Sequence, residues 1–203
     1  MVKQTRDDII NSATRHFADR GFYGASIAEI ASDLGVTKQA LLHHFGTKEK
    51  LYGEVLQGIS QHFIAQVIQA ATMEGDPAKK VEDVLLALHA NAQTARLETQ
   101  LLMRELLDNK RRAATAQAWY LKPFLDALIA MLKRTKGWAD ASDAEALAAI
   151  YQALGAINYF AISEETLSHM FGAGQMQDVE AAYPGRLRLM IRQIIAAPPE
   201  RDI

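Results

Sequence analysis

Residues 26–51, SIAEIASDLGVTKQALLHHFGTKEKL, constrain the fold of this chain most strongly, because they carry signals for two helix starts and a turn. Ser26 followed by Glu29 has the pattern of a capping box, in which the serine hydroxyl accepts from a first-turn amide and the glutamate accepts from the serine amide. Gly35 follows an apolar stripe, and glycine readily adopts the left-handed conformation that ends a helix. We therefore predict a short helix before Gly35. Its apolar stripe is Ile27, Ile30, Ala31 and Leu34.

A second helix is predicted to begin directly after this turn, because Thr37 is a good N-cap. Two helices joined by so short a turn with glycine cross steeply, as they do in DNA-binding helix-turn-helix units. The second helix of such a unit turns its N-terminal residues toward the bases in the major groove. Here Gln39 matches the edge of adenine, Lys38 reaches guanine or a phosphate, and Ala40 fits beside a thymine methyl.

The far side of this second helix is predicted to be buried, because Leu41 and Phe45 lie four residues apart. Gly46 and Thr47 then mark a turn and the N-cap of the next helix. A helix N-terminus presents free amides and partial positive charge, which favour a phosphate. Lys48, beside Thr47, is therefore predicted to contact the DNA backbone.

The pattern of residues 26–51 resembles the N-terminal DNA-binding domain of the TetR/AcrR family of bacterial transcriptional repressors. The resemblance is close over about the first quarter of the chain and concerns only the all-helical architecture beyond it. It implies a homodimer, and hence a palindromic operator, with DNA released when a small ligand enters a C-terminal pocket. We expect this effector to be apolar or amphipathic. The family contacts to DNA would fall on Ser26, Thr37, Lys38, Gln39, Leu42, His43, His44 and Lys48.

One position departs from the family pattern. Many relatives carry a tyrosine that touches backbone or base where this chain has Leu42. Leu42 would therefore either meet a thymine methyl or simply pack against its neighbours.

The composition favours an ordinary globular protein. A chain of 203 residues that is 49% hydrophobic is long enough for one extended or two modest domains. Cysteine is absent, which excludes disulfides and thiolate metal ligands and suits a reducing compartment. The first residues lack the apolar segment of a secretory signal. We therefore expect a cytoplasmic protein.

The charge is local rather than global. A net charge of −2 and a pI near 6.3 argue against a protein that binds nucleic acid over its whole surface. Residues 37–50 nevertheless hold Lys38, Lys48 and Lys50 against Glu49. The position of these lysines at two helix N-termini favours a DNA-binding surface over an ordinary solvated face.

We predict an all-α chain: a three-helix helix-turn-helix DNA-binding domain over residues 1–47, and a helical effector-binding and dimerisation domain over residues 48–203. Asp76 followed by Pro77, and Ser142 with Glu145, indicate two of the later helix starts. The predicted helices outside the helix-turn-helix are 4–20, 48–73, a fifth from residue 77, 97–107, one reaching residue 132, 144–162, a short one over 163–171, and a last one from 178 or 184 to 197.

A ligand pocket is predicted near Pro123, because proline inside a helical pattern kinks the helix and a kink opens space. His89, beside an apolar stripe, would supply a polar group to this pocket. Core filling is the ordinary alternative for each of the large apolar residues. The predicted ligand-binding residues are Phe63, His89, Met103, Trp119, Phe124 and Leu128.

The two apolar helices at the end of the chain predict a four-helix interface across a two-fold axis. The segment 144–162 is too interrupted by polar residues for a membrane span, so no membrane association is expected. The predicted interface residues are Leu147, Tyr151, Leu154, Asn158, Leu187, Met190, Ile191 and Ile194.

Other classes of function have weaker support. Di-iron bundles need Glu-x-x-His pairs, which the sequence lacks, and residues 24–28 lack the second glycine of a nucleophile elbow. We expect no enzyme, no metal and no cofactor. One alternative is a helix-turn-helix dimer that acts mainly as a structural or protein-partner DNA binder without an effector pocket. A ligand-induced shift in thermal stability with loss of operator binding would favour the sensor, and an unresponsive C-terminal domain without a cavity would favour the alternative.

Overall fold

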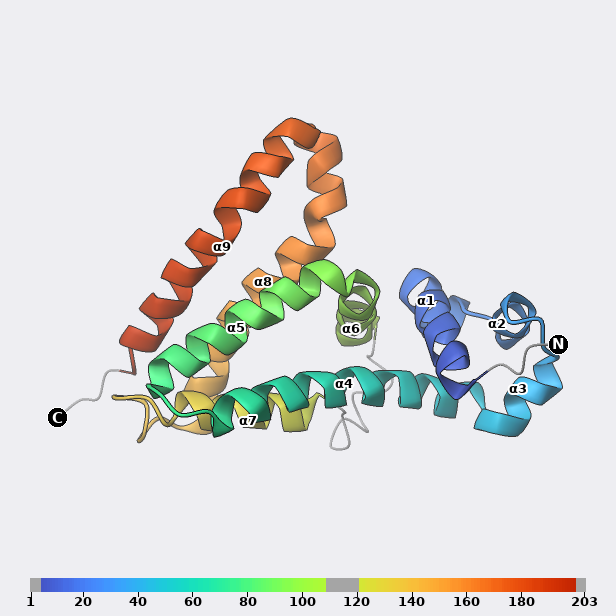
Figure 1. Cartoon of the computed structure of the whole chain (residues 1–203), viewed down its shortest axis with the longest axis horizontal. Helices are drawn as coiled ribbons and strands as arrows, with labels where there is room; N and C mark the ends of the chain where they lie inside the picture. The colour runs from blue at the N-terminus through green and yellow to red at the C-terminus, as the bar shows by residue number, and fades with distance from the viewer. Residues whose placement is uncertain (1–4, 109–120, 200–203) are drawn as a thin grey trace. The chain divides into compact units, whose positions relative to one another are not determined.

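The computed structural model describes residues 5–108 and 121–199, and these ranges contain helices and no strand. The predicted all-α class is confirmed. The chain divides into two compact units: unit 1 comprises residues 1–61 and 97–120, and unit 2 comprises 62–96 and 121–203. Figure 1 gives the order of the helices along the chain. The functional boundary predicted at residues 47 and 48 stays a prediction.

Unit 1 begins with a capped helix that is longer than predicted. The Thr5 side chain accepts from the Asp8 amide at 3.2 Å, and the Asp8 carboxylate accepts from the Thr5 amide at 2.8 Å. The helix was expected to end at Arg20, but it continues through a local kink at Gly21, where φ is +68°. Unit 1 contains α1 (Arg6–Gly24), α2 (Ile27–Asp33) and α3 (Lys38–Phe45). It also contains α4 (Lys48–Thr72) up to residue 61 and, from residue 97 on, α6 (Arg96–Asp108).

The core of unit 1 is built on aromatic rings. The Phe17 and Tyr52 rings meet edge to face with centroids 4.8 Å apart, and Phe22 lies 5.1 Å from Tyr52. The Tyr52 hydroxyl donates to the Glu105 carboxylate at 2.6 Å, and both residues are buried. This bond joins α4 to α6 within the unit, and it satisfies a carboxylate that would be costly to bury alone.

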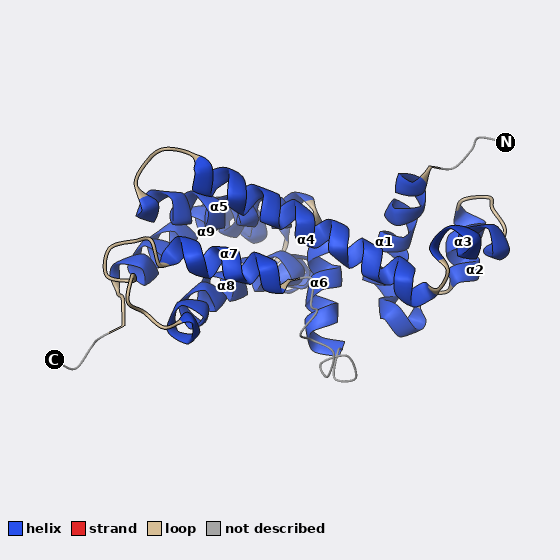
Figure 2. Cartoon of the chain, turned by 90° about the horizontal axis from the view of Figure 1, so that it is seen from below, coloured by secondary structure: helices blue, strands red, loops and turns tan. Residues whose placement is uncertain are grey.

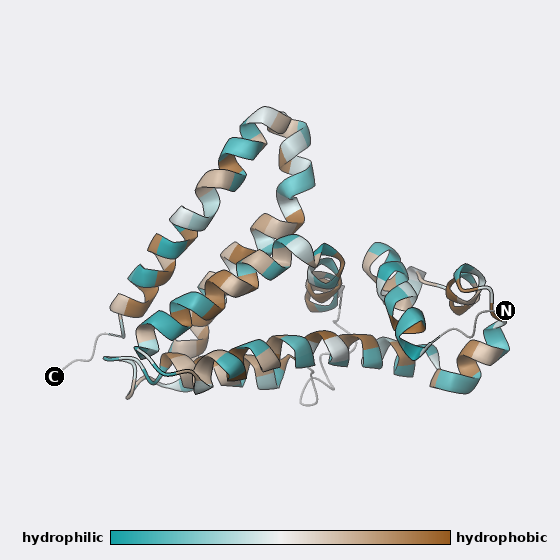
Figure 3. Cartoon of the chain, viewed as in Figure 1, coloured by the Kyte–Doolittle hydropathy of each residue, from teal (hydrophilic) through white to brown (hydrophobic). Residues whose placement is uncertain are grey.

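Unit 2 is a bundle in which α8 packs against α5, α7 and α9. Figure 2 shows the described segments as helices joined by short connections, and Figure 3 shows apolar and polar positions alternating along them. This alternation is the helical amphipathicity that lets each helix bury one face. Among the fully buried residues are Leu85, Leu128, Leu132, Ile150, Ile157 and Ile191. The helices lying wholly in unit 2 are α5 (Pro77–Thr94), α7 (Lys122–Leu132), α8 (Asp143–Phe171) and α9 (Ala173–Ala196).

Helix α8 is long and apolar enough to cross a membrane by length and composition alone, with a mean hydropathy of 1.3 over its most apolar window. Its packing on three other helices gives a different reason for that composition. A helix that is buried on several sides needs apolar residues around most of its circumference.

Three predictions about unit 2 are wrong. Pro123 does not kink a helix: it lies in the first turn of α7, where a missing amide leaves no bond unmade. Residues 163–171 do not form a separate helix, because the Ser163 hydroxyl donates to the Tyr159 carbonyl at 2.7 Å and α8 continues. The last helix begins at Ala173 and contains Pro184 in its interior. The capping box of Ser142 and Glu145 and the cap at Asp76 are confirmed.

We expect Tyr52→Phe to lower the free energy of unfolding by about 1–3 kcal/mol, because it removes a donor from a buried carboxylate. Tyr23→Phe is the matched control, since Tyr23 belongs to the same group of rings but is 64% exposed, and it should change stability by less than about 0.5 kcal/mol. Urea unfolding of the two variants makes the comparison. Equal losses would show that the bond to Glu105 contributes nothing specific.

Candidate nucleic-acid interface

The helix-turn-helix begins at Ser26, whose side chain accepts from the Ala28 amide at 3.2 Å. The predicted N-cap is therefore confirmed, but the reciprocal bond, in which the Ser26 amide would donate to the Glu29 carboxylate, is not formed. The Glu29 carboxylate instead pairs with Arg20 of α1. Ile27 and Ile30 are buried as predicted, so α2 presents its apolar stripe to the core of unit 1.

The turn after α2 is a complete Schellman motif. Gly35 has φ of +64°, which is the left-handed conformation predicted for it. The Val36 amide donates to the Ala31 carbonyl, and the Gly35 amide donates to the Ser32 carbonyl, each at 3.0 Å. These bonds satisfy the carbonyls at the end of α2 and fix the direction in which the chain leaves the helix.

Helix α3 begins one residue beyond this turn. The Thr37 side chain caps it by accepting from the Ala40 amide at 3.1 Å. Leu41 and Phe45 are buried and fasten one face of α3 to unit 1, while Leu42 is half-buried. The exposed face of α3 consists of Lys38, Gln39, Ala40, His43 and His44.

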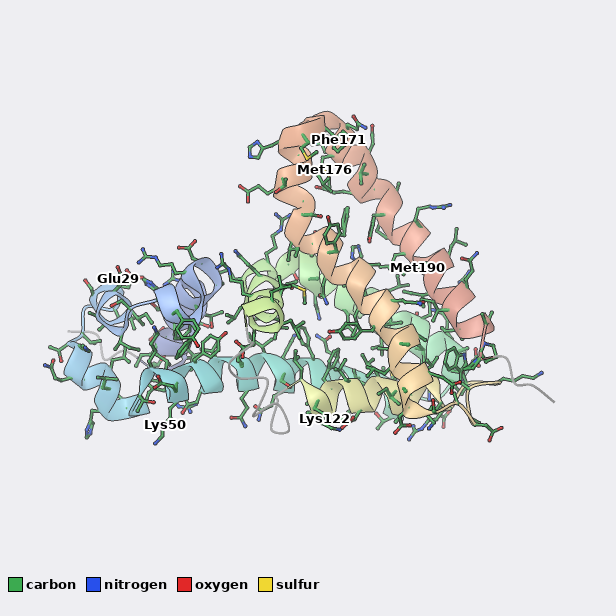
Figure 4. All side chains as sticks on the ribbon, turned by 180° about the vertical axis from the view of Figure 1, so that it is seen from behind. Glu29, Lys50, Lys122, Phe171, Met176 and Met190 are labelled. Atoms are coloured by element: carbon green, nitrogen blue, oxygen red, sulfur yellow. The ribbon has the colours of Figure 1, made fainter. Side chains whose placement is uncertain are left out.

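The start of α4 adds a second group of donors. The Thr47 side chain accepts from the Lys50 amide at 3.2 Å, as an N-cap should. Lys48 is half-buried: its Nζ lies 4.8 Å from the centroid of the Phe22 ring, and burial lowers the pKa of its ammonium group. Lys50 is exposed, and in Figure 4 it lies at the opposite edge of unit 1 from Glu29. Lys50 is thus the more accessible cation at this helix start.

A histidine–carboxylate hydrogen bond and an ion pair position these helices, and the sequence analysis missed both. His16 Nε2 lies 2.9 Å from Asp33 Oδ2, which joins α1 to the last residue of α2. Arg6 pairs with Glu54 at 2.6 Å, and its guanidinium carbon lies 5.7 Å from the centroid of the Phe45 ring. The partners are 17 and 48 residues apart, so no local pattern identifies them.

The predicted ligand residues are only partly brought together. In unit 2 the Phe63 and Phe124 rings lie 5.6 Å apart, and Phe124 and Leu128 are buried in the core, which is the ordinary alternative. Met103 belongs to α6 in unit 1, and Trp119 lies outside the described residues.

His89 is a buried polar group of unit 2, as the sequence indicated. It is 6% exposed, and its ring lies 6.0 Å from Phe160 and 5.4 Å from Tyr183. Its Nδ1 has no hydrogen-bond partner among the described residues, and burial lowers the pKa of the ring. His89 is therefore held in the neutral form beside aromatic rings.

The predicted interface residues fall into two groups. Leu154, Leu187 and Ile191 are buried in the core of their own chain, so they are not surface residues. Tyr151 is 51% exposed on α8. The remaining residues are half-buried on α8 or α9: Leu147, Asn158, Met190 and Ile194. Met190 is labelled in Figure 4.

Residues 9–55 match the model of a family described as bacterial regulatory proteins, tetR family. This range contains α2, the Schellman turn, α3 and the start of α4. Over these residues, which hold the helix-turn-helix, the chain is similar to the TetR family.

The curated proteins that match part of this chain are transcriptional regulators. The HTH-type transcriptional regulator AcrR of Shigella flexneri is 30% identical over 111 residues, which cover 54% of this chain and 50% of that protein. The HTH-type transcriptional repressor KstR2 of Mycobacterium tuberculosis is 26% identical over 86 residues, which cover 42% of this chain and 43% of that protein. The chain thus spans half or less of the length of these relatives.

Solved TetR-like structures share the fold over nearly the whole chain. The fatty acid degradation regulator FadR of Bacillus halodurans superimposes with a TM-score of 0.74 at 15% identity, covering 96% of this chain and 100% of that chain. FadR of Bacillus subtilis, solved with stearoyl-CoA, gives a TM-score of 0.71 at 14% identity, covering 97% of this chain and 100% of that chain. At these identities the likeness shows the shared fold, in agreement with the predicted all-α architecture.

We expect Gly35→Ala to lower the free energy of unfolding by about 1–2 kcal/mol, because a side chain resists the left-handed conformation. Gly58→Ala is the control: Gly58 is exposed inside α4, a Cβ there would meet nothing within 4 Å, and the change should stabilise by about 0.5–1 kcal/mol. Thermal unfolding measures both. Destabilisation of similar size in the two variants would remove the special role of Gly35.

Proposed function

We propose that the chain is a transcriptional regulator that binds duplex operator DNA as a homodimer and releases it when a small effector binds. The observation that carries this proposal is the exposed N-terminal face of α3, fixed by the Thr37 cap and the Schellman turn at Gly35. A short helix held by its far face and free at its N-terminus is what a major groove accommodates.

The residues on this face have complementary chemistry. Gln39 is exposed one residue into α3, and its amide offers a donor and an acceptor to the edge of an adenine. Ala40 leaves room for a thymine methyl, and Lys38 reaches guanine or a phosphate. The exposed His43 and His44 follow in the last turn of α3 and extend the same surface.

Phosphate contacts would orient this face without reading sequence. The start of α4 supplies helix amides with Lys48 and the more exposed Lys50, and Ser26 and Thr37 mark the starts of α2 and α3. Lys48 would keep its aliphatic stem against Phe22 and direct its ammonium group to the backbone.

The effector would bind in unit 2, where His89 places an unpartnered polar atom beside the stacked rings of Phe160 and Tyr183, whose centroids are 3.7 Å apart. An apolar or amphipathic effector fits such a mixture of rings and one neutral polar group. The effector would release DNA by preferring a conformation in which the two α3 helices of the dimer do not match the operator spacing.

The dimer would use the exposed apolar stripe of α8. Tyr151, Tyr159 and Ile162 lie at helical spacing and are 51%, 72% and 40% exposed. Large apolar side chains that are exposed in a row mark a surface that another chain covers. A two-fold dimer through this stripe would make the operator palindromic.

Selection of bound DNA from a random pool tests the proposed function, and we expect a palindrome for the unmodified chain. Gln39→Ala should relax the preference at one base pair in each half-site, at a cost of about 1–3 kcal/mol. Lys48→Ala should weaken binding to all sequences alike and lower the salt slope by about 0.9. Lys122→Ala, at an exposed position of α7, is the control and should leave the base preference and the salt slope unchanged.

Loss of affinity for all sequences on Gln39→Ala would contradict direct base reading by that residue. A salt slope that Lys48→Ala leaves unchanged would remove Lys48 from the phosphate contacts. A pool that yields no enriched sequence would contradict the proposed function itself.

We expect Tyr151→Glu to raise the dissociation constant of the dimer by about tenfold or more, because it buries a charge in an apolar interface. Gln57→Glu introduces the same charge at an exposed position of another helix, α4, and should have little effect. Sedimentation equilibrium measures both. A dimer that tolerates Tyr151→Glu as well as Gln57→Glu does not use this stripe.

A further inference from the structure

We propose that unit 2 contains a binding site for a small amphiphilic anion, a carboxylate or phosphate with a short apolar chain. The site is a cleft of about 600 Å³ between the first turns of α5, the connection after α7 and the end of α9. Figure 1 shows these three segments meeting at one end of the bundle. The volume lies within the range of small-molecule sites in proteins, about 300–1,000 Å³.

The central feature of the cleft is a fixed arginine. Glu82 is 4% exposed, and its two oxygens accept from Arg192 Nε at 2.7 Å and Arg192 Nη2 at 3.2 Å. A buried carboxylate that binds a guanidinium in this two-point manner fixes its plane. Arg192 has five N–H groups, so it keeps further donors after both bonds to Glu82 are made. Its side chain is 56% exposed in the cleft wall, where those donors are available.

Several acceptors that line the cleft already accept hydrogen bonds within the chain. The two oxygens of Asp76 accept from the Ala78 and Lys79 amides at 3.4 and 3.2 Å. The Ile195 carbonyl, near the end of α9, accepts from Trp138 Nε1 at 2.9 Å. With the carboxylates of Asp76 and Glu82 both occupied, a ligand in the cleft meets donors more readily than acceptors.

Additional positive charge surrounds Glu82. Arg188 Nε and Lys79 Nζ lie 3.5 and 3.7 Å from Glu82 Oε1. Lys136 also lines the cleft, and its exposed ammonium group forms no ion pair within the described residues. Lys79 Nζ also pairs with Asp83. The four cations at the cleft, Lys79, Lys136, Arg188 and Arg192, still outnumber the carboxylates of Asp76, Glu82 and Asp83, so the local charge favours an incoming anion.

Part of the cleft wall is apolar. Ile195 and Pro198 line it beside Gly137, where φ is +87°. Pro198 approaches so closely that a Cβ on Gly137 would lie 2.7 Å from the Pro198 Cγ atom, so a residue without a side chain is required there. An apolar wall next to a fixed guanidinium selects a ligand that has both a charged head and a short hydrocarbon chain.

This site is separate from the effector position proposed at His89. Lys79 and His89 are ten residues apart on α5, which corresponds to about 15 Å along the helix axis. The anion site also involves none of the residues proposed to contact DNA. It therefore stands or falls independently of the proposed function.

Isothermal titration of the full chain with hexanoate, hexyl phosphate and hexanol tests the proposal. We expect saturable binding of hexanoate or hexyl phosphate at one site per chain, with the stronger of the two identifying the head group. Hexanol should bind at least about tenfold more weakly, because it lacks the charge. Lys136→Ala and Arg192→Lys should each weaken binding of the anion by about tenfold, the second because it keeps the charge but loses the planar fork.

Arg134→Ala is the matched control, since it removes one exposed positive charge from the same connection but does not line the cleft. Equal weakening by Arg134→Ala and Lys136→Ala would reduce the effect to general electrostatics and overturn the site. Binding of hexanol as tight as that of the anions, binding unchanged in Lys136→Ala and Arg192→Lys, or no saturation by either anion at millimolar concentration would also overturn it. Far-UV circular dichroism verifies that each variant is folded.

Discussion

The proposed activity depends on the pair of backbone hydrogen bonds that close the turn after α2. The Val36 and Gly35 amides reach back to the Ala31 and Ser32 carbonyls, and this closure exists only because Gly35 adopts a left-handed conformation. Since the turn allows one exit direction, α3 leaves at a fixed angle and buries Leu41 while its other face stays exposed. A backbone constraint of this kind lets a helix only eight residues long present side chains in defined positions.

Sequence reasoning was sufficient where the signals are local. The caps at Thr37 and Ser142, the glycine of the turn and the apolar stripes follow from residues within one or two helical turns of each other. It failed where distant partners compete: Glu29 prefers Arg20 of α1 to the amide of Ser26. Pro123 was misplaced because proline is compatible with a first turn as well as with a kink, and only the observed start of α7 distinguishes the two.

In both units, buried carboxylates bind donors from other helices. Glu105 of unit 1 accepts from a tyrosine hydroxyl, and in unit 2 Glu82 and Glu164 pair with Arg192 and Arg96. Each buried acid thus has a donor from a helix distant in sequence, which ties helices together in a defined register but leaves no local pattern to detect. The pairing is incomplete at Glu164, whose Oε2 is buried without a partner among the described residues, and in unit 2 the same holds for Gln66 Oε1, His89 Nδ1 and Gln93 Nε2. Among these atoms, His89 Nδ1 is the one that belongs to a ring packed beside Phe160 and Tyr183.

The central claim is that the exposed face of α3 lies in the major groove. Dimethyl sulfate footprinting of the full chain on a bound duplex tests it most directly, because the reagent methylates guanine N7 in the major groove and adenine N3 in the minor groove. If α3 lies in the major groove, guanines are protected in two patches whose centres are separated by about one helical turn, or a multiple of it, while the adenines stay reactive. Protection confined to adenine N3, or no protection of a duplex that the chain binds, would contradict this claim.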